Sequence, residues 1–177
     1  MAGILDSSRF IYFLSEELKI PVQKISSFVL GGHGDSMVAM LESTQVDGKK
    51  INELIKDGTL SKERLDQIVD RTKKGGAEIV KYLENGSAFY APAASGVEMA
   101  ECYLKDLKRQ LPCAVYLDKQ YGAKDIYAGV PVIIGAGGVE KIIELNLSAK
   151  EKVNFENSVK AVKDLFDAAK KIDPNLR

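Results

Sequence analysis

Ile25-Ser26-Ser27-Phe28-Val29-Leu30-Gly31-Gly32-His33-Gly34-Asp35 joins an apolar run to a glycine-rich loop that holds the only histidine of the chain. The apolar run predicts a buried strand over 25–30, and the glycines predict a loop where that strand ends. Histidine is the side chain best suited to moving one proton near neutral pH. Since site residues often stand on loops fixed by a rigid element, this loop indicates acid/base chemistry. The alternative is a turn histidine at the surface without a chemical role.

Composition argues against several classes of partner. Lys plus Arg and Asp plus Glu number 25 each, so the net charge is zero and no basic stripe predicts nucleic-acid binding. No apolar run approaches the roughly 20 residues of a membrane-spanning helix, and no signal-like leader opens the chain. Cys102 and Cys113 are too far apart for a Cys-x-x-Cys pair and lack a nearby histidine. We therefore expect reduced, buried thiols in a cytoplasmic protein, with no metal site and no membrane partner.

Helical periodicity predicts four long helices. They cover Ile4 to about Lys19, Ser61 to Leu83, Ser87 to about Lys108, and Ser148 to about Ile172. Ser61 and Ser148 are predicted N-caps, because a serine side chain can accept a free N–H of the first turn. The apolar face predicted for the last helix consists of Val153, Phe155, Val159, Val162, Leu165 and Phe166.

Strands and hairpins fill the rest of the pattern. Strands are predicted at 25–30, Met37–Val46, Leu111–Leu117, Gly129–Ile134 and Val139–Leu145, with a short helix over Ile51–Lys56. Asp47-Gly48 predicts a hairpin turn. Strands and helices do not alternate as they do in a parallel sheet. The predicted fold class is therefore α+β, with mixed or antiparallel strands packed against long helices in one domain over residues 1–177.

The segment Val130-Pro131-Val132-Ile133-Ile134-Gly135-Ala136-Gly137-Gly138-Val139-Glu140 resembles a strand followed by a dinucleotide-binding glycine turn. That fingerprint needs a third glycine where this chain has Glu140, whose carboxylate would repel a pyrophosphate. Lys141 to Leu145 also reads as a returning strand. We therefore predict a hairpin at Gly137-Gly138 and no nucleotide-binding unit in this chain.

Asp6 and Arg9 lie three residues apart and so share one helix face. One interpretation is an intrahelical ion pair, worth only a few tenths of a kcal/mol at a surface. In the other, Asp6 fixes the tautomer of His33 and Arg9 grips a substrate carboxylate with its planar fork. Spacing alone leaves both open.

Leu5-Asp6-Ser7-Ser8-Arg9-Phe10, followed by Gly31-Gly32-His33-Gly34-Asp35, resembles the lactate/malate dehydrogenase family. The resemblance continues through Gly86–Ala93, Tyr121-Gly122 and Gly129–Glu140, and thus covers essentially the whole chain. It is nearest to bacterial malate dehydrogenases of the lactate-dehydrogenase-like group. It implies the C-terminal, substrate-binding domain of such an enzyme.

The resemblance also implies roles for individual residues. His33 matches the catalytic acid/base and Asp6 the carboxylate that orients it. Arg9 matches the arginine that holds the substrate carboxylate. Ala88 falls where the family lines the substrate pocket, and its small side chain leaves room for a second carboxylate. Ile11 departs from relatives that carry a basic residue there, which we expect to alter packing or subunit contacts.

The resemblance further implies the cofactor and the partners. NAD is expected to bind mainly to a Rossmann domain that precedes Met1 and is absent from this chain, with only the His33 loop near the nicotinamide. The implied activity is reversible oxidation of (S)-malate to oxaloacetate in the tricarboxylic acid cycle, by a homodimer or homotetramer. The alternatives are an L-lactate dehydrogenase, or an isolated inactive lobe that only self-associates.

Overall fold

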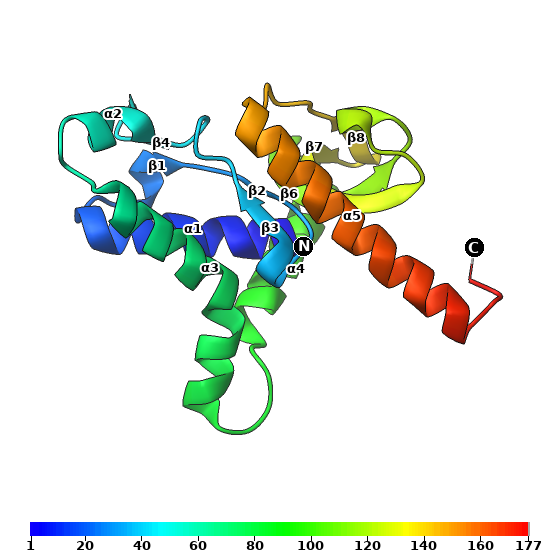
Figure 1. The fold of residues 1–177 in the computed structure, drawn as a ribbon. Helices are drawn as coiled ribbons and strands as arrows, with labels where there is room; N and C mark the ends of the chain where they lie inside the picture. Colours follow the sequence, from blue (N-terminus) through cyan, green and yellow to red (C-terminus); the bar gives the residue numbers. More distant parts are fainter. Residues whose placement is uncertain (177) are drawn as a thin grey trace.

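Five helices and two antiparallel sheets make up the computed structural model, which describes residues 1–176 (Figure 1). The helices are α1 (Ala2–Leu18), α2 (Ile51–Lys56), α3 (Lys62–Leu83), α4 (Tyr90–Leu104) and α5 (Ala149–Ile172). A small sheet holds β1 (Ile25–Ser26), β4 (Gln45–Val46) and β5 (Lys49–Lys50). The larger sheet holds β2 (Val29–Gly31), β3 (Met37–Ala39), β6 (Arg109–Leu117), β7 (Ile126–Gly135) and β8 (Gly138–Ile142). The predicted α+β fold class is confirmed.

The predicted helix caps and the predicted hairpin turn form at the residues that indicated them in the sequence. Ser61 accepts the N–H of Arg64 at the start of α3, and Ser148 forms a reciprocal capping box with Glu151 at the start of α5. Asp47 and Gly48, both with positive φ, turn the chain between β4 and β5. These polar and glycine signals act locally, so the element boundaries beside them follow directly from the sequence.

The predicted strand over 25–30 is wrong as one element. It divides into β1 and β2, which belong to different sheets, and Met37–Val46 likewise divides into β3 and β4. The Ser27 and Thr44 hydroxyls, both buried, lie 2.7 Å apart at the junction, and Thr44 also donates to the carbonyl of Met40. This buried polar contact holds the two segments together where they cross between sheets.

Two further predictions need correction. Helix α4 begins at Tyr90, not Ser87, and ends at Leu104, because Gly86 before it and Asp106 after it adopt positive φ. On α5, Val153, Leu165 and Phe166 are exposed, whereas the polar Ser158 is buried beside Phe155. The inward face of α5 is thus less apolar than the sequence predicts.

The core consists of two apolar clusters that α1 joins. Ile4 belongs to the cluster beneath the larger sheet, with Phe155 of α5. Phe10 and Leu14 belong to the cluster that packs against Leu65 of α3 and the small sheet. The helix turn between Ile4 and Phe10 therefore lies where the clusters meet. No helix among residues 1–176 is long and apolar enough to cross a membrane.

Candidate active site

Helix α1 carries Asp6 into the interior. An ideal Cβ at Gly3 would lie 2.6 Å from the carbonyl oxygen of Pro112, so glycine lets α1 rest directly on β6. One turn later the Asp6 side chain is only 1% exposed. A carboxylate is rarely buried so deeply unless it is paired, which makes its partners the central question.

The loop after β2 carries His33. Gly31, with φ of 86°, is the one residue of β2 that pairs with β7, opposite Gly129. An ideal Cβ at Gly129 would lie 2.7 Å from the carbonyl oxygen of Gly31, so both strands need glycine at this crossing. After it the chain turns through the 3₁₀ turn η2 (Gly34–Ser36) into β3.

Asp6 and His33 form a hydrogen-bonded pair, which is the arrangement that the family resemblance implies. The His33 Nδ1 atom lies 2.8 Å from Asp6 Oδ2, and the imidazole side chain is 54% exposed. In the neutral ring Nδ1–H donates to the carboxylate, which leaves Nε2 as the unprotonated nitrogen. No hydrogen bond among residues 1–176 engages Nε2. The ring is thus anchored on one side and free on the other.

Burial raises the pKa of the Asp6 carboxyl above its ordinary value. The hydrogen bond from His33 and the charges of His33 and Arg9 act in the opposite direction. Among the described residues, Asp6 Oδ1 is the one buried side-chain oxygen or nitrogen without a hydrogen-bond partner. The site therefore holds its carboxylate at a cost in folding free energy.

Arg9 lies beside the same carboxylate but does not form a hydrogen bond with it. Its Nη1 atom lies 3.8 Å from Asp6 Oδ1, an ion pair too long for a hydrogen bond. Its side chain is 11% exposed and packs on α3, where an ideal Cβ at Gly75 would lie 3.1 Å from Arg9 Cδ. Since the guanidinium forms no hydrogen bond with another described residue, its N–H groups are available to bind the carboxylate of a ligand.

Arg9 also lines a hollow of about 300 Å³ against α4, with Ala91, Ala94 and Ser95 on its far wall. This hollow does not include His33. Ala88 does not line it either; it lies half-buried in the segment that joins α3 to α4. The structure thus brings Asp6, His33 and Arg9 together, and the pocket role of Ala88 stays a prediction.

Two serines and a glycine at the site were missed by sequence reasoning. The hydroxyl of Ser7 accepts the N–H of Val29, and that of Ser158 accepts the N–H of Gly32. Gly75 supports Arg9. Two sequence features could have pointed to them: the glycine pair Gly75-Gly76 inside a helix, and Ser158 within the apolar stripe of α5. Neither feature identifies the residue that the glycine or the serine contacts.

The glycine turn at 135–138 is a hairpin between β7 and β8, as predicted, but it turns at Ala136-Gly137, one residue before the predicted Gly137-Gly138, because Gly138 already pairs with Gly135. The N–H of Ala136 donates to Asp106 Oδ1 at 2.8 Å, and that of Gly137 points to Glu140 Oε1 at 3.4 Å. Carboxylates therefore occupy the amides that would have to face a pyrophosphate. The turn does not fit a dinucleotide.

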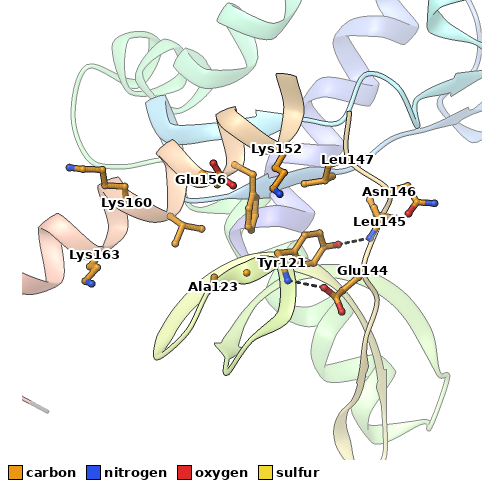
Figure 2. Close-up of a pocket in the computed structure, with 13 residues that line it drawn as sticks. Tyr121, Ala123, Glu144, Leu145, Asn146, Leu147, Lys152, Glu156, Lys160 and Lys163 are labelled. Carbon is orange, nitrogen blue, oxygen red and sulfur yellow. Dashed lines mark hydrogen bonds between the residues drawn. The ribbon is translucent and has the colours of Figure 1, made fainter. Parts of the chain in front are cut away.

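A groove with a volume of about 610 Å³ lies on a different part of the molecule, and Figure 2 shows the residues that line it. Its walls are α5, the 3₁₀ turn η3 (Gln120–Gly122) and the segment after β8. The Tyr121 hydroxyl accepts the N–H of Leu145 and donates to the carbonyl of Ile143, which fixes one wall. None of the predicted site residues lines this groove.

Comparison with known proteins gives the family. Residues 4–172 match the lactate/malate dehydrogenase, alpha/beta C-terminal domain. This chain belongs to the lactate/malate dehydrogenase family. A malate dehydrogenase of Pelagibacter ubique (strain HTCC1062) is 62% identical over 176 residues, which are 99% of this chain and 55% of that protein.

Solved structures of the family have the same fold. The crystal structure of Cryptosporidium parvum malate dehydrogenase matches with a TM-score of 0.93 and 42% identity, over 97% of this chain and 55% of that one. Eimeria maxima lactate dehydrogenase, solved with NADH and oxamate, gives a TM-score of 0.94 and 39% identity over 99% and 55%. The chain therefore spans about half the length of the relatives it matches.

Proposed function

We propose that this chain is the substrate-binding and catalytic lobe of an NAD-dependent malate dehydrogenase. The reaction is (S)-malate + NAD⁺ ⇌ oxaloacetate + NADH + H⁺. The observation that carries this proposal is the 2.8 Å contact between His33 Nδ1 and Asp6 Oδ2, with Arg9 beside the same carboxylate. The 62% identity to the Pelagibacter malate dehydrogenase supports the choice of substrate.

His33 is the proposed acid/base group. With Nδ1 held by Asp6, proton exchange with substrate falls to Nε2, on the exposed side of the ring. In oxaloacetate reduction Nε2–H donates its proton to the carbonyl oxygen, and in malate oxidation Nε2 accepts the hydroxyl proton. Asp6 stabilises the imidazolium through a charge-assisted hydrogen bond. Positioned proton transfer of this kind contributes roughly 10²–10⁴-fold to rate.

Arg9 is the proposed clamp for the substrate carboxylate beside the reacting carbon. Two parallel N–H donors fix both the position and the orientation of a carboxylate, whereas a lysine supplies only a point charge. The long contact to Asp6 leaves those donors free. Ala88 is proposed to line the pocket for the second carboxylate.

NAD fits only in part on these residues. An ideal Cβ at Gly34 would meet no atom within 4 Å, so a flat ring can approach the His33 loop. The glycine turn at 135–138 cannot take the pyrophosphate, because carboxylates occupy its amides. When bound, the cofactor supplies the hydride chemistry. We propose that a separate N-terminal Rossmann domain holds it and that the 177-residue chain alone is inactive.

The cellular setting is part of the same proposal. We propose a cytoplasmic enzyme of the tricarboxylic acid cycle that works as a homodimer or homotetramer. Support for self-association comes from apolar side chains that α4 leaves exposed, namely Tyr90, Val97 and Leu104. Contiguous exposed apolar surface commonly marks an interface.

L-lactate dehydrogenase is the second candidate, because the Eimeria lactate dehydrogenase matches this fold with a TM-score of 0.94. The deciding experiment measures NADH oxidation with oxaloacetate and with pyruvate, using a protein that contains this chain together with its NAD-binding domain. A preference for oxaloacetate supports malate dehydrogenase. A preference for pyruvate supports the alternative, and no activity with either overturns both.

A further inference from the structure

A serine far along the sequence holds the backbone that carries His33. Ser158 Oγ on α5 accepts the N–H of Gly32 at 2.8 Å, across 126 positions of sequence. Ser158 is only 3% exposed, so this hydroxyl does not face water. Helix α5 contacts β2, η2 and β3, the elements on both sides of the His33 loop (Figure 1).

A second serine acts on the other end of the same strand. Ser7 Oγ, on α1 next to Asp6, accepts the N–H of Val29 at 2.9 Å. β2 pairs with β3 along its whole length but with β7 at Gly31 alone, and the acceptors of these two N–H groups are serine hydroxyls instead of carbonyls of a neighbouring strand. Two hydroxyls from two helices therefore bind N–H groups at both ends of β2 and add to its pairing with β3.

We propose that Ser158 is a positioning residue for His33: by accepting the N–H of Gly32, it sets the loop so that the imidazole meets Asp6. The proposal rests on the proposed function, in which that pairing orients the acid/base group. Ser158 itself stays out of reach of the substrate, since its hydroxyl is buried against the loop backbone.

The glycines before His33 fit this role. An ideal Cβ at Gly31 would lie 2.9 Å from Ser158 Cβ, and one at Gly32 would lie 3.3 Å from Val162 Cγ2 of α5. A side chain at Gly31 would push α5 away, and one at Gly32 would first meet Ser36 Oγ of η2 and would also crowd α5. The glycine pair thus lets α5 approach close enough for its hydroxyl to reach the backbone.

The test uses nitrogen NMR of the ring, which is unambiguous because His33 is the only histidine. The unmodified 177-residue chain should show the neutral ring as the Nδ1–H tautomer, and Ser158→Ala should shift it towards the mixture of an unrestrained ring. Ser27→Ala is the matched control, because it also removes a buried hydroxyl near β2 but one that contacts Thr44. It should keep the Nδ1–H tautomer.

An unchanged tautomer in Ser158→Ala overturns the proposal, and so does an equal change in both variants, which would indicate general loosening. If Ser158→Ala fails to fold, hydrogen exchange of the unmodified chain decides. The Gly32 amide should then be protected, and exchange at the rate of a free amide would contradict the proposal.

A kinetic measurement links the loop to turnover. In the protein with its NAD-binding domain, Ser158→Ala should lower kcat by roughly 10- to 100-fold, because misplacement of about 1 Å has such an effect. The KM for NADH should stay unchanged, and a fall in kcat/KM due to KM alone would count against positioning. The NMR result needs neither cofactor nor turnover, so it stands or fails separately from the proposed function.

Discussion

Asp6 and His33 share one hydrogen bond of 2.8 Å across the boundary between interior and surface. The carboxylate is 1% exposed and the imidazole 54% exposed. The buried carboxylate anchors the ring through Nδ1, and Nε2 has no hydrogen bond among the described residues. Under the proposed function, this division accounts for an ionisable group in the core, where its charge is costly.

Asp6→Asn should make the folded chain more stable relative to the unmodified one as pH rises. Burial raises the pKa of the Asp6 carboxyl above its ordinary 3.8, so the folded state binds this proton more tightly than the unfolded state. The contribution of Asp6 to the free energy of unfolding therefore falls as pH rises from about 4 through the raised folded value. Asparagine does not titrate, so it removes this pH-dependent fall in the free energy of unfolding.

Urea unfolding of both proteins between about pH 4 and pH 8 measures the difference. Progressive destabilisation of Asp6→Asn relative to the parent chain with rising pH would show that the carboxylate is favourable on balance. Turnover should fall regardless, because a neutral amide cannot stabilise an imidazolium as a carboxylate does.

Arg9→Lys should weaken oxo-acid binding and leave cofactor binding alone. Loss of one charge-assisted hydrogen bond of about 2 kcal/mol predicts a rise of roughly 30-fold in the KM for oxaloacetate. The KM for NADH is the internal control. Equal rises in both constants would refute the carboxylate clamp.

Gly75→Ala should weaken substrate binding without loss of the fold. Alanine favours the helix by about 0.5–1 kcal/mol, but its Cβ would lie 3.1 Å from Arg9 Cδ and displace that side chain. We expect a severalfold higher KM for oxaloacetate without loss of the fold. Gly76→Ala is the matched control, because its Cβ would lie 3.8 Å from Arg9 Nη1, an ordinary contact. Equal KM values in the two variants would contradict the packing argument.

Cys113 should resist alkylation in the folded chain. Burial raises the pKa of this thiol to about 11, so little thiolate forms at pH 8, and Cys102 is fully buried beside the same core. Iodoacetamide labelling followed by mass spectrometry should find both thiols unmodified until urea unfolds the chain. Rapid labelling of the native protein would show that this part of the core opens.

Local signals predicted α3 and α5 well, because caps and breakers act within a few residues, whereas the bounds of α4 were predicted too wide. Ser61, Ser148 and Asp47-Gly48 each produce the structure that their chemistry favours. The strand over 25–30 was mispredicted because no glycine or proline separates its two halves. What divides them is a contact with Thr44, which lies outside any local window.

The site was predicted unevenly for the same reason. Spacing placed Asp6 and Arg9 on one face, but only the resemblance to a family linked them to His33. Ser158 and Gly75 act through partners on other elements, which periodicity does not reveal. Residues that hold a site in place thus escape sequence reasoning more easily than residues that carry its charge.

The most direct test of the central claim is the turnover of His33→Asn with oxaloacetate and NADH, in the protein that contains this chain and its NAD-binding domain. Asparagine keeps a polar side chain at an exposed position but cannot exchange a proton. We predict an unchanged unfolding midpoint and a fall in kcat of roughly 10²–10⁴-fold. Turnover within a few-fold of the parent enzyme would contradict the assignment of His33 as the acid/base group.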